Sequence, residues 1–256
     1  MKDEETFVFG VNPVREKLRA SPRDVLEILI ATSGEKPALR SIDAEARRIG
    51  LPVTYVNREF LSRLTRGEKH QGVLAKVEAH RHVPFAVLEQ RISEPNAPGR
   101  VLILDGLTDP RNFGALLRTA EAVGIQHVII PKDRSVKVTP TVVKASAGAI
   151  HYLTVYQATN LRRAMTVLKE RGFWMVGLSA GAEADIYDIE YPERLGIVLG
   201  SEGKGARPII LKECDYLVSI PMLGKIASLN VAVAGGIFFY ELLRQRQSID
   251  KGGGTR

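Results

Sequence analysis

An asparagine and an arginine that follow a buried strand are the residues of this chain best placed to do chemistry. Residues 101–104 form a short apolar run typical of parallel sheets, and the polar stretch through Asn112 leads into a helix that should end at Gly124. Ligands of open α/β sheets gather outside the carboxyl ends of strands, which places Asn112 and Arg118 near a potential site. A guanidinium keeps its proton at neutral pH and is a poor base, so Arg118 could stabilise a negative charge but would not accept a proton.

Simpler roles for these two residues remain open. Asn112 could cap the helix by accepting a hydrogen bond from one of its free N–H groups. Arg118 shares a stripe of the helix with Gly114 and Glu121, so it could be a surface side chain paired with Glu121 three residues later. The helix alone does not distinguish a site from an ordinary helix surface.

A second polar segment follows the predicted strand 195–199 and holds a single carboxylate, Glu202, among glycines at 200, 203 and 205. A phosphate-binding loop requires Ser or Thr after its Gly-Lys pair, and here Gly205 follows Lys204, so that interpretation fails. The glycines leave the backbone free to adopt positive φ angles. The segment is therefore either a loop that presents Glu202 or a plain turn with a solvated glutamate.

The third segment contains Ser228 and Asn230 and leads into a helix predicted over 231–245. Ser228 is placed to cap this helix, which would leave Asn230 in the first turn, where asparagine is not preferred. Gly235 and Gly236 lie inside the helix, and each costs about 1 kcal/mol relative to alanine. We therefore expect something to pack closely against them, either a partner helix or a threaded segment of chain.

Length and composition indicate a globular protein with a polyanionic partner. The 256 residues suffice for one large or two ordinary domains, and 45% are hydrophobic and 25% charged. The net charge of +7 favours a partner such as RNA. Cys214 is the only cysteine, which excludes an intrachain disulfide and a multi-cysteine zinc site, and the five histidines show no ligand spacing, so no metal is expected. With no signal region and no apolar run of about 20 residues, we expect a cytoplasmic protein that does not enter membranes.

The pattern of elements predicts an α/β protein with two domains. We expect a small α/β domain over 1–80, a Pro-rich linker over 81–100, a second α/β domain over 101–247 and a flexible tail over 248–256. Strands are predicted at 25–31, 53–56, 72–77, 101–104, 127–130, 173–178, 195–199 and 216–220, and helices of the first domain at 12–20, 38–49 and 58–64.

Taken together, the three polar segments resemble the SpoU, or TrmH, family of RNA ribose 2′-O-methyltransferases, which belongs to the SPOUT superfamily. The motifs are Asp109–Gly114 with Arg118, Leu199–Gly203, and 220–222 with 228–232, in the family's order and spacing. Residues 6–78 are similar, less specifically, to the L30e-like RNA-binding domain of family members that act on large-subunit ribosomal RNA.

The resemblance implies a fold, a cofactor and an assembly. The fold would be a trefoil-knotted α/β domain, with a mostly parallel sheet and helices on both faces, preceded by the L30e-like domain. The cofactor would be S-adenosylmethionine, contacted by Gly200, Ile220 and Leu229, and the protein would be a homodimer. Carried over from the family, the catalytic constellation is Asn112, Arg118, Glu202, Ser228 and Asn230. In it, the two asparagines would orient Arg118 and the ribose, and Ser228 would brace its loop.

The implied reaction is methylation of a ribose 2′-hydroxyl, that of a guanosine in 23S-type ribosomal RNA. Alternatives within the family are a transfer-RNA enzyme and an antibiotic-resistance enzyme that acts on ribosomal RNA. A different class is a non-catalytic RNA-binding or ribosome-assembly factor of the same fold.

A basic cluster in the first domain is the candidate RNA contact. It consists of Arg58, Arg63, Arg66, Lys69 and His70. The alternative is an ordinary solvated helix and loop. Only 6% of the residues are aromatic and none cluster in this region, so recognition of RNA shape and backbone is expected rather than base stacking.

Overall fold

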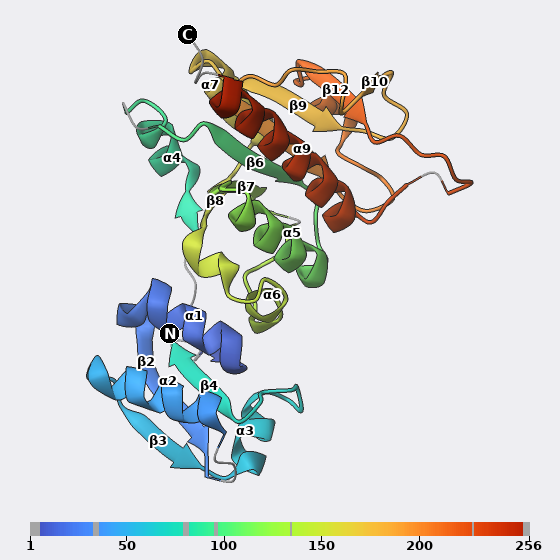
Figure 1. Cartoon of the computed structure of the whole chain (residues 1–256). Helices are drawn as coiled ribbons and strands as arrows, with labels where there is room; N and C mark the ends of the chain where they lie inside the picture. Colours follow the sequence, from blue (N-terminus) through green and yellow to red (C-terminus); the bar gives the residue numbers. More distant parts are fainter. Residues whose placement is uncertain are drawn as a thin grey trace. The chain divides into compact units, whose positions relative to one another are not determined.

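The computed structural model of the chain describes residues 6–32, 36–78, 82–94, 97–133, 135–226 and 228–252. Its contacts divide the chain into two compact units, and Figure 1 labels most of their helices and strands. The first unit comprises 1–81 together with 138–152, and the second comprises 82–137 and 153–256.

A four-stranded sheet forms the centre of the first unit, with strand order β1–β4–β2–β3. β4 is antiparallel to β1 and β2, and β2 is parallel to β3. The strands are β1 (Thr6–Phe9), β2 (Val25–Ala31), β3 (Val53–Val56) and β4 (Val73–Val77). The helices are α1 (Val11–Ala20), η1 (Pro22–Asp24), α2 (Pro37–Arg48), α3 (Arg58–Leu64), α6 (Pro140–Ala145) and η2 (Ala149–Tyr152). The predicted strands and helices of this part are confirmed, and β1 was not predicted.

The segment 138–152 packs against α1 and the turn after α3, although it is distant from both in the sequence. Gly148 has a φ of +91°, and a Cβ there would lie 2.6 Å from the Glu16 Cβ. The Tyr152 hydroxyl donates a hydrogen bond to Glu16 Oε2 at 2.6 Å, and Lys144 Nζ lies 2.8 Å from Glu68 Oε2. These contacts make the segment part of the first unit.

The second unit is built on an eight-stranded sheet with the order β10–β12–β9–β11–β6–β7–β8–β5, in which all pairings are parallel. The strands are β5 (Val83–Pro84), β6 (Arg100–Asp105), β7 (His127–Pro131), β8 (Thr154–Ala158), β9 (Trp174–Leu178), β10 (Ala184–Asp185), β11 (Leu195–Gly200) and β12 (Tyr216–Ser219). The helices are α4 (Phe85–Arg91), α5 (Pro110–Ala122), α7 (Leu161–Glu170), α8 (Pro208–Leu211) and α9 (Val231–Gly252).

Helices cover both faces of this sheet, as the resemblance implied. On one face, α4, α7 and α8 contribute side chains to a cluster that includes Ile103 of β6 and Val198 of β11. On the other face α5 and α9 pack against each other, and Figure 1 shows α9 lying across the strands. Since side chains alternate along a strand, Leu199 points away from the cluster of Val198 and meets α9 at Gly235. The parallel α/β architecture with helices on both faces is thus confirmed.

Several elements of the structure were not predicted, among them the helices α6, η2, α7 and α8. The strands β5, β8 and β10 were not predicted. The last helix does not end near residue 245 but continues to Gly252, so the expectation of a flexible tail from residue 248 is wrong for 248–252. Residues 253–256 of the expected tail lie outside the described part. Among the described residues, no helix is both long and apolar enough to cross a membrane.

Candidate functional site

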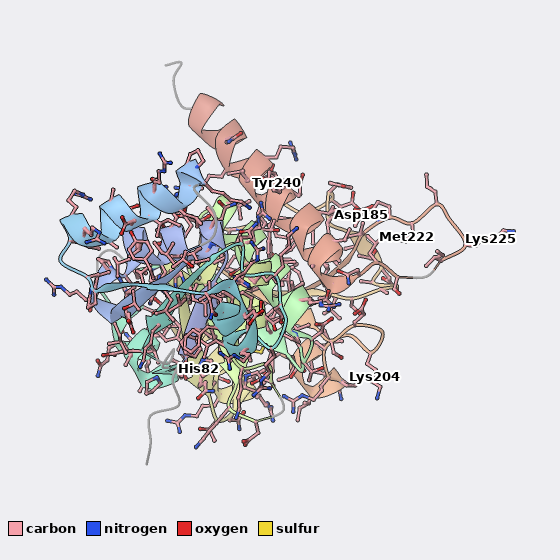
Figure 2. The ribbon with its side chains drawn as sticks, turned by 90° about the horizontal axis from the view of Figure 1, so that it is seen from below. His82, Asp185, Lys204, Met222, Lys225 and Tyr240 are labelled. Atoms are coloured by element: carbon pink, nitrogen blue, oxygen red, sulfur yellow. The ribbon has the colours of Figure 1, made fainter. Side chains whose placement is uncertain are left out.

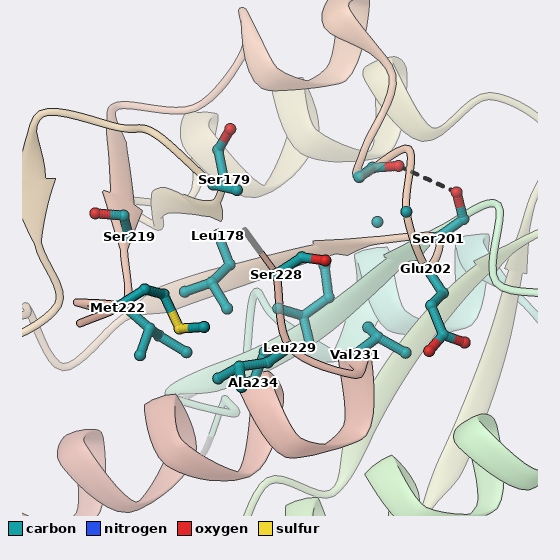
Figure 3. A pocket seen from close by; sticks show the side chains of 16 residues that line it. Leu178, Ser179, Ser201, Glu202, Ser219, Met222, Ser228, Leu229, Val231 and Ala234 are labelled. Carbon is teal, nitrogen blue, oxygen red and sulfur yellow. Dashed lines mark hydrogen bonds between the residues drawn. The ribbon is translucent and has the colours of Figure 1, made fainter. Parts of the chain in front are cut away.

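A pocket opens in the second unit where several parallel strands end (Figure 3). Its lining comes from four places: the end of β9 (178–180), the end of β11 and the loop after it (199–203 and 205), the end of β12 (219, 220 and 222), and the start of α9 with the residues before it (228, 229, 231 and 234). The carboxyl ends of parallel strands are where ligands of open α/β sheets bind. Segments far apart in the sequence therefore share one cavity.

The three residues predicted to contact a cofactor all line this pocket. They are Gly200, Ile220 and Leu229. At Gly200 a Cβ atom would fall on the backbone of Gly205 and Ala206, so the closely folded chain allows only glycine there. The pocket wall at this point is therefore bare main chain.

Three polar side chains from the three predicted segments form a closed hydrogen-bonded triangle. Asn112 Nδ2 donates to Glu202 Oε2 at 2.8 Å, and Asn230 Nδ2 donates to Glu202 Oε1 at 3.1 Å. Asn230 Nδ2 also lies 3.0 Å from Asn112 Oδ1, which accepts from it. Glu202 lines the pocket, and Figure 3 shows it there beside Ser201. Glu202 is thus not a merely solvated turn residue.

The helix caps explain why the amides point at Glu202. Asp109, not Asn112, caps α5, since its Oδ1 accepts from the Arg111 N–H at 2.8 Å. Asn230, not Ser228, caps α9, since its Oδ1 accepts from the Ala232 N–H at 2.9 Å. Because Asn230 Oδ1 is used as the cap, its Nδ2 must face the other two members of the triangle. The capping roles predicted for Asn112 and Ser228 are therefore wrong.

Arg118 and Ser228 are both exposed side chains. Ser228 is exposed and lines the pocket. Arg118 is exposed on α5, and within the described part of the chain its side chain has no hydrogen-bond or ion-pair partner. The predicted alternative, a pair with Glu121, is not formed, and the asparagines bond Glu202 rather than Arg118. The guanidinium is thus available to an incoming group.

Gly235 confirms the close packing expected inside the last helix, and Gly236 does not. A Cβ at Gly235 would overlap the Leu116 side chain of α5 and lie 3.0 Å from the Leu199 side chain of β11. At Gly236 the nearest atom, from Thr119, would be at an ordinary 3.7 Å. The close approach of α9 to α5 brings Asn230 within reach of Asn112.

The sequence analysis missed an ion pair between the end of β6 and the residues that follow the loop after β11. The Asp105 side chain, at the end of β6, is 1% exposed, and Arg207 Nη2 lies 2.8 Å from its Oδ1. The Arg207 backbone N–H donates to Asp105 Oδ2 at 2.8 Å. The only sequence signal was an aspartate ending an apolar run, which also fits a plain strand end.

Four of the five residues of the predicted basic cluster are exposed, and the fifth is buried. Arg58, Arg63, Arg66 and Lys69 are exposed on α3 and the turn that follows. His70 is 4% exposed: its Nδ1 accepts from the Gly72 N–H at 3.1 Å, and its Nε2 lies 3.2 Å from Ser62 Oγ. Burial, aided by the charge of Arg58, lowers the pKa of His70. His70 is therefore a buried residue that holds the turn, and the structure does not place it on the exposed surface formed by the other four.

No cluster of three or more His, Cys, Asp or Glu side chains in the described ranges is arranged to hold a metal ion. The cysteine, Cys214, is half-buried, and burial together with Asp215 raises the pKa of its thiol to about 12.

Two family models match the chain. The model described as the SpoU rRNA Methylase family matches residues 99–240, and that for RNA 2′-O ribose methyltransferase substrate binding matches 7–83. Among curated proteins, the 23S rRNA (guanosine-2′-O-)-methyltransferase RlmB of Xanthomonas campestris is 41% identical over 96% of this chain and 99% of its own. RlmB of Shewanella oneidensis is 38% identical over 95% of this chain and 99% of its own.

The solved structures that resemble this chain include other SpoU enzymes. The SpoU methyltransferase AviRb from Streptomyces viridochromogenes, in complex with the cofactor AdoMet, superposes with a TM-score of 0.78 at 25% identity and covers 95% of this chain and 91% of its own. A TrmH/SpoU tRNA-modifying enzyme from A. aeolicus superposes with a TM-score of 0.55 at 27% identity and covers 65% of this chain and 84% of its own.

Proposed function

The chain belongs to the SpoU family of RNA ribose methylases, and from this premise we propose that it methylates the ribose 2′-hydroxyl of a guanosine in large-subunit ribosomal RNA. One observation carries the proposal at the level of residues. The triangle of Asn112, Glu202 and Asn230 joins the three family motifs at the edge of a pocket, and Arg118 is exposed on the helix that carries Asn112.

The pocket suits S-adenosylmethionine. Gly200, Ile220 and Leu229 would hold it, and the absence of a side chain at Gly200 leaves main chain for it to lie against. When bound, S-adenosylmethionine would supply a methyl group on its sulfonium: the carbon–sulfur bond would break as the carbon–oxygen bond forms, and the hydroxyl proton would pass to water. Much of the rate should come from alignment, which can contribute on the order of 7–11 kcal/mol.

The polar residues would align the ribose and stabilise its oxygen. Arg118 would face the 2′-oxygen and stabilise the negative charge that develops on it, because a guanidinium is a poor base. Asn112 and Asn230 hold the Glu202 carboxylate through their amides, so Glu202 can keep a fixed position beside the ribose. Ser228, at the rim of the pocket, would brace its loop.

Two further family features belong to the proposal: the trefoil knot and the homodimer. The path of the chain is compatible with the knot, since it returns from β12, near one edge of the sheet, to α9, which packs over β11 and α5.

The homodimer would use α9, where Val233 and Tyr240 are 51% and 55% exposed, and Figure 2 shows Tyr240 at the surface. A second copy would cover these side chains, and sedimentation equilibrium of the purified protein should give twice the chain mass.

An assay of methyl transfer tests the proposed function. The purified protein is incubated with labelled S-adenosylmethionine and large-subunit ribosomal RNA, and 2′-O-methyl groups are then mapped along the RNA. We expect a single modified guanosine. Transfer only to transfer RNA would favour that branch of the family, and cofactor binding without transfer to any RNA would indicate a non-catalytic assembly factor.

The first unit would supply the RNA-binding surface through Arg58, Arg63, Arg66 and Lys69. Replacing all four with glutamine should weaken RNA binding and make it less sensitive to salt. Each lost phosphate contact should reduce the slope of log affinity against log salt by about 0.7–0.9. The measurement is the RNA dissociation constant at several salt concentrations, together with the dissociation constant of S-adenosylmethionine, which should not change.

The matched control removes basic residues from another helix of the same unit. Arg40, Arg47 and Arg48 are exposed on α2. Their replacement with glutamine should leave the salt slope close to that of the unaltered protein. Losses in proportion to the charges removed, four in the variant against three in the control, would point to net charge rather than a binding surface. Substitution is preferable to deletion of the first domain, because deletion would uncover the segment 138–152 that packs against α1.

A further inference from the structure

The Asp105 carboxylate depends on Arg207 for its hydrogen bonds. Its side chain is 1% exposed, and Arg207 approaches both oxygens: Nε lies 2.9 Å from Oδ1 and the backbone N–H is 2.8 Å from Oδ2. A buried carboxylate without such donors is strongly unfavourable. The pair therefore fixes Arg207 to the end of β6.

This contact closes the base of the hairpin that lines the pocket. Gly200 enters the hairpin as the register partner of Asp105 in the sheet, and Arg207 leaves it bound to the same aspartate. Inside, the Ser201 N–H donates to the Gly205 carbonyl at 3.0 Å, and the Gly205 N–H donates to the Ser201 carbonyl at 2.9 Å. The hairpin is thus anchored at its entry and its exit by one residue of β6.

The tip of the hairpin carries Glu202, which belongs to the proposed catalytic residues. Glu202 lies there and meets the asparagines, while Gly203 and Gly205 adopt positive φ angles of +78° and +68°. Glycine loses more conformational freedom than any other residue when it is ordered, so these two positions make the hairpin costly to order. Its position then depends on how firmly the base is held.

We propose that Asp105 and Arg207 are positioning residues, which hold the hairpin 201–205 so that the cofactor pocket is preformed and Glu202 reaches Asn112 and Asn230. This inference rests on the proposed function, since it takes the pocket to bind S-adenosylmethionine. Neither residue needs to touch the reacting atoms. Both act through the hairpin.

The Arg207 side chain is 60% exposed, so a direct contact with an RNA phosphate is the competing explanation. The two explanations predict different cofactor affinities when RNA is absent. A phosphate contact has no bearing on cofactor affinity, whereas a loosened hairpin must be ordered when the cofactor binds.

The test measures S-adenosylmethionine binding to the full chain by titration calorimetry without RNA. We expect Arg207→Met to weaken the affinity by about tenfold, because ordering a loop on binding opposes association. Turnover at saturating cofactor and RNA should fall by about 10²-fold, the scale expected for a small misplacement of reacting groups, with little change in the KM for RNA. Arg207→Lys keeps one cationic donor, so its cofactor affinity and its turnover should lie between those of the unaltered protein and those of Arg207→Met.

Arg244→Met provides a closely matched control. Arg244 pairs with Glu241 at 2.8 Å, and the two side chains are 63% and 4% exposed, close to the values for Arg207 and Asp105. This pair lies on α9, about 15 Å along the helix axis from its first turn at the pocket. Arg244→Met should therefore leave the affinity for S-adenosylmethionine unchanged.

Thermal melting and circular dichroism establish that each variant is folded at the assay temperature. If Arg207→Met does not fold, Arg207→Lys and Asp105→Asn are used in its place. Adding Asp105→Asn to Arg207→Met should weaken binding little further, since both changes remove the same contact.

Unchanged cofactor affinity and turnover in Arg207→Met, with only the KM for RNA raised, would overturn the proposal. The proposal would also be overturned if Arg244→Met weakened S-adenosylmethionine binding as much as Arg207→Met does. Failure of the unaltered protein to bind S-adenosylmethionine would instead count against the proposed function.

Discussion

Replacing Arg118 with alanine should lower methyl transfer by about 10²-fold or more, the loss that follows removal of one donor to a developing oxyanion. The affinity for S-adenosylmethionine should hardly change, because Arg118 is not among the residues that line the pocket. Stability should also be preserved, since the exposed guanidinium has no partner in the described part of the chain. Single-turnover rates and cofactor titration of the same preparation measure the two effects.

Arg163→Ala serves as the control for this substitution. Arg163 is exposed on α7, on the face of the sheet opposite α5 and α9, so its loss should alter neither rate nor affinity. A rate near that of the unaltered protein in Arg118→Ala would remove Arg118 from the catalytic assignment. The pH dependence separates its possible roles: a rate that is flat across neutrality supports charge stabilisation, and a titration near pH 7 indicates a general base elsewhere.

The sequence was sufficient to bring the site segments together. Apolar runs located β6, β9, β11 and β12, and polar residues after a parallel strand must lie at the same edge of the sheet. The spacing of the motifs then matched a family whose cofactor lies at that edge. This much follows from local patterns and from the resemblance.

The contacts inside the site could not be predicted in the same way. Asp105 and Arg207 are 102 residues apart, and Asn112 and Asn230 are 118 apart. No local pattern relates such residues, so the capping roles considered for Asn112 and Ser228 rested on their own helices alone. His70 shows the same limit, because basic neighbours suggested exposure while the fold of its turn buries it.

The largest structural effect is expected from Gly200→Ala. The added methyl group would fall on the backbone of Gly205 and Ala206, which cannot rotate away as a side chain can. β11 is hydrogen-bonded to β6 on one side and β9 on the other, so the strand cannot shift to make room. The hairpin must therefore open, which removes one wall of the pocket and withdraws Glu202 from the asparagines. We expect no measurable binding of S-adenosylmethionine by calorimetry.

Gly224→Ala distinguishes this effect from a general intolerance of loops near the pocket. A Cβ at Gly224 would have no atom within 4 Å, and the residue lies in the segment that joins Ile220 to Leu229. This variant should bind S-adenosylmethionine as the unaltered protein does.

Overpacking of a well-ordered strand costs typically about 1–3 kcal/mol, so Gly200→Ala should also melt at a lower temperature than the unaltered protein. If Gly200→Ala bound the cofactor with unchanged affinity, the hairpin could not be a wall of the cofactor site, and the assignment of Gly200, Ile220 and Leu229 to the cofactor would have to be abandoned.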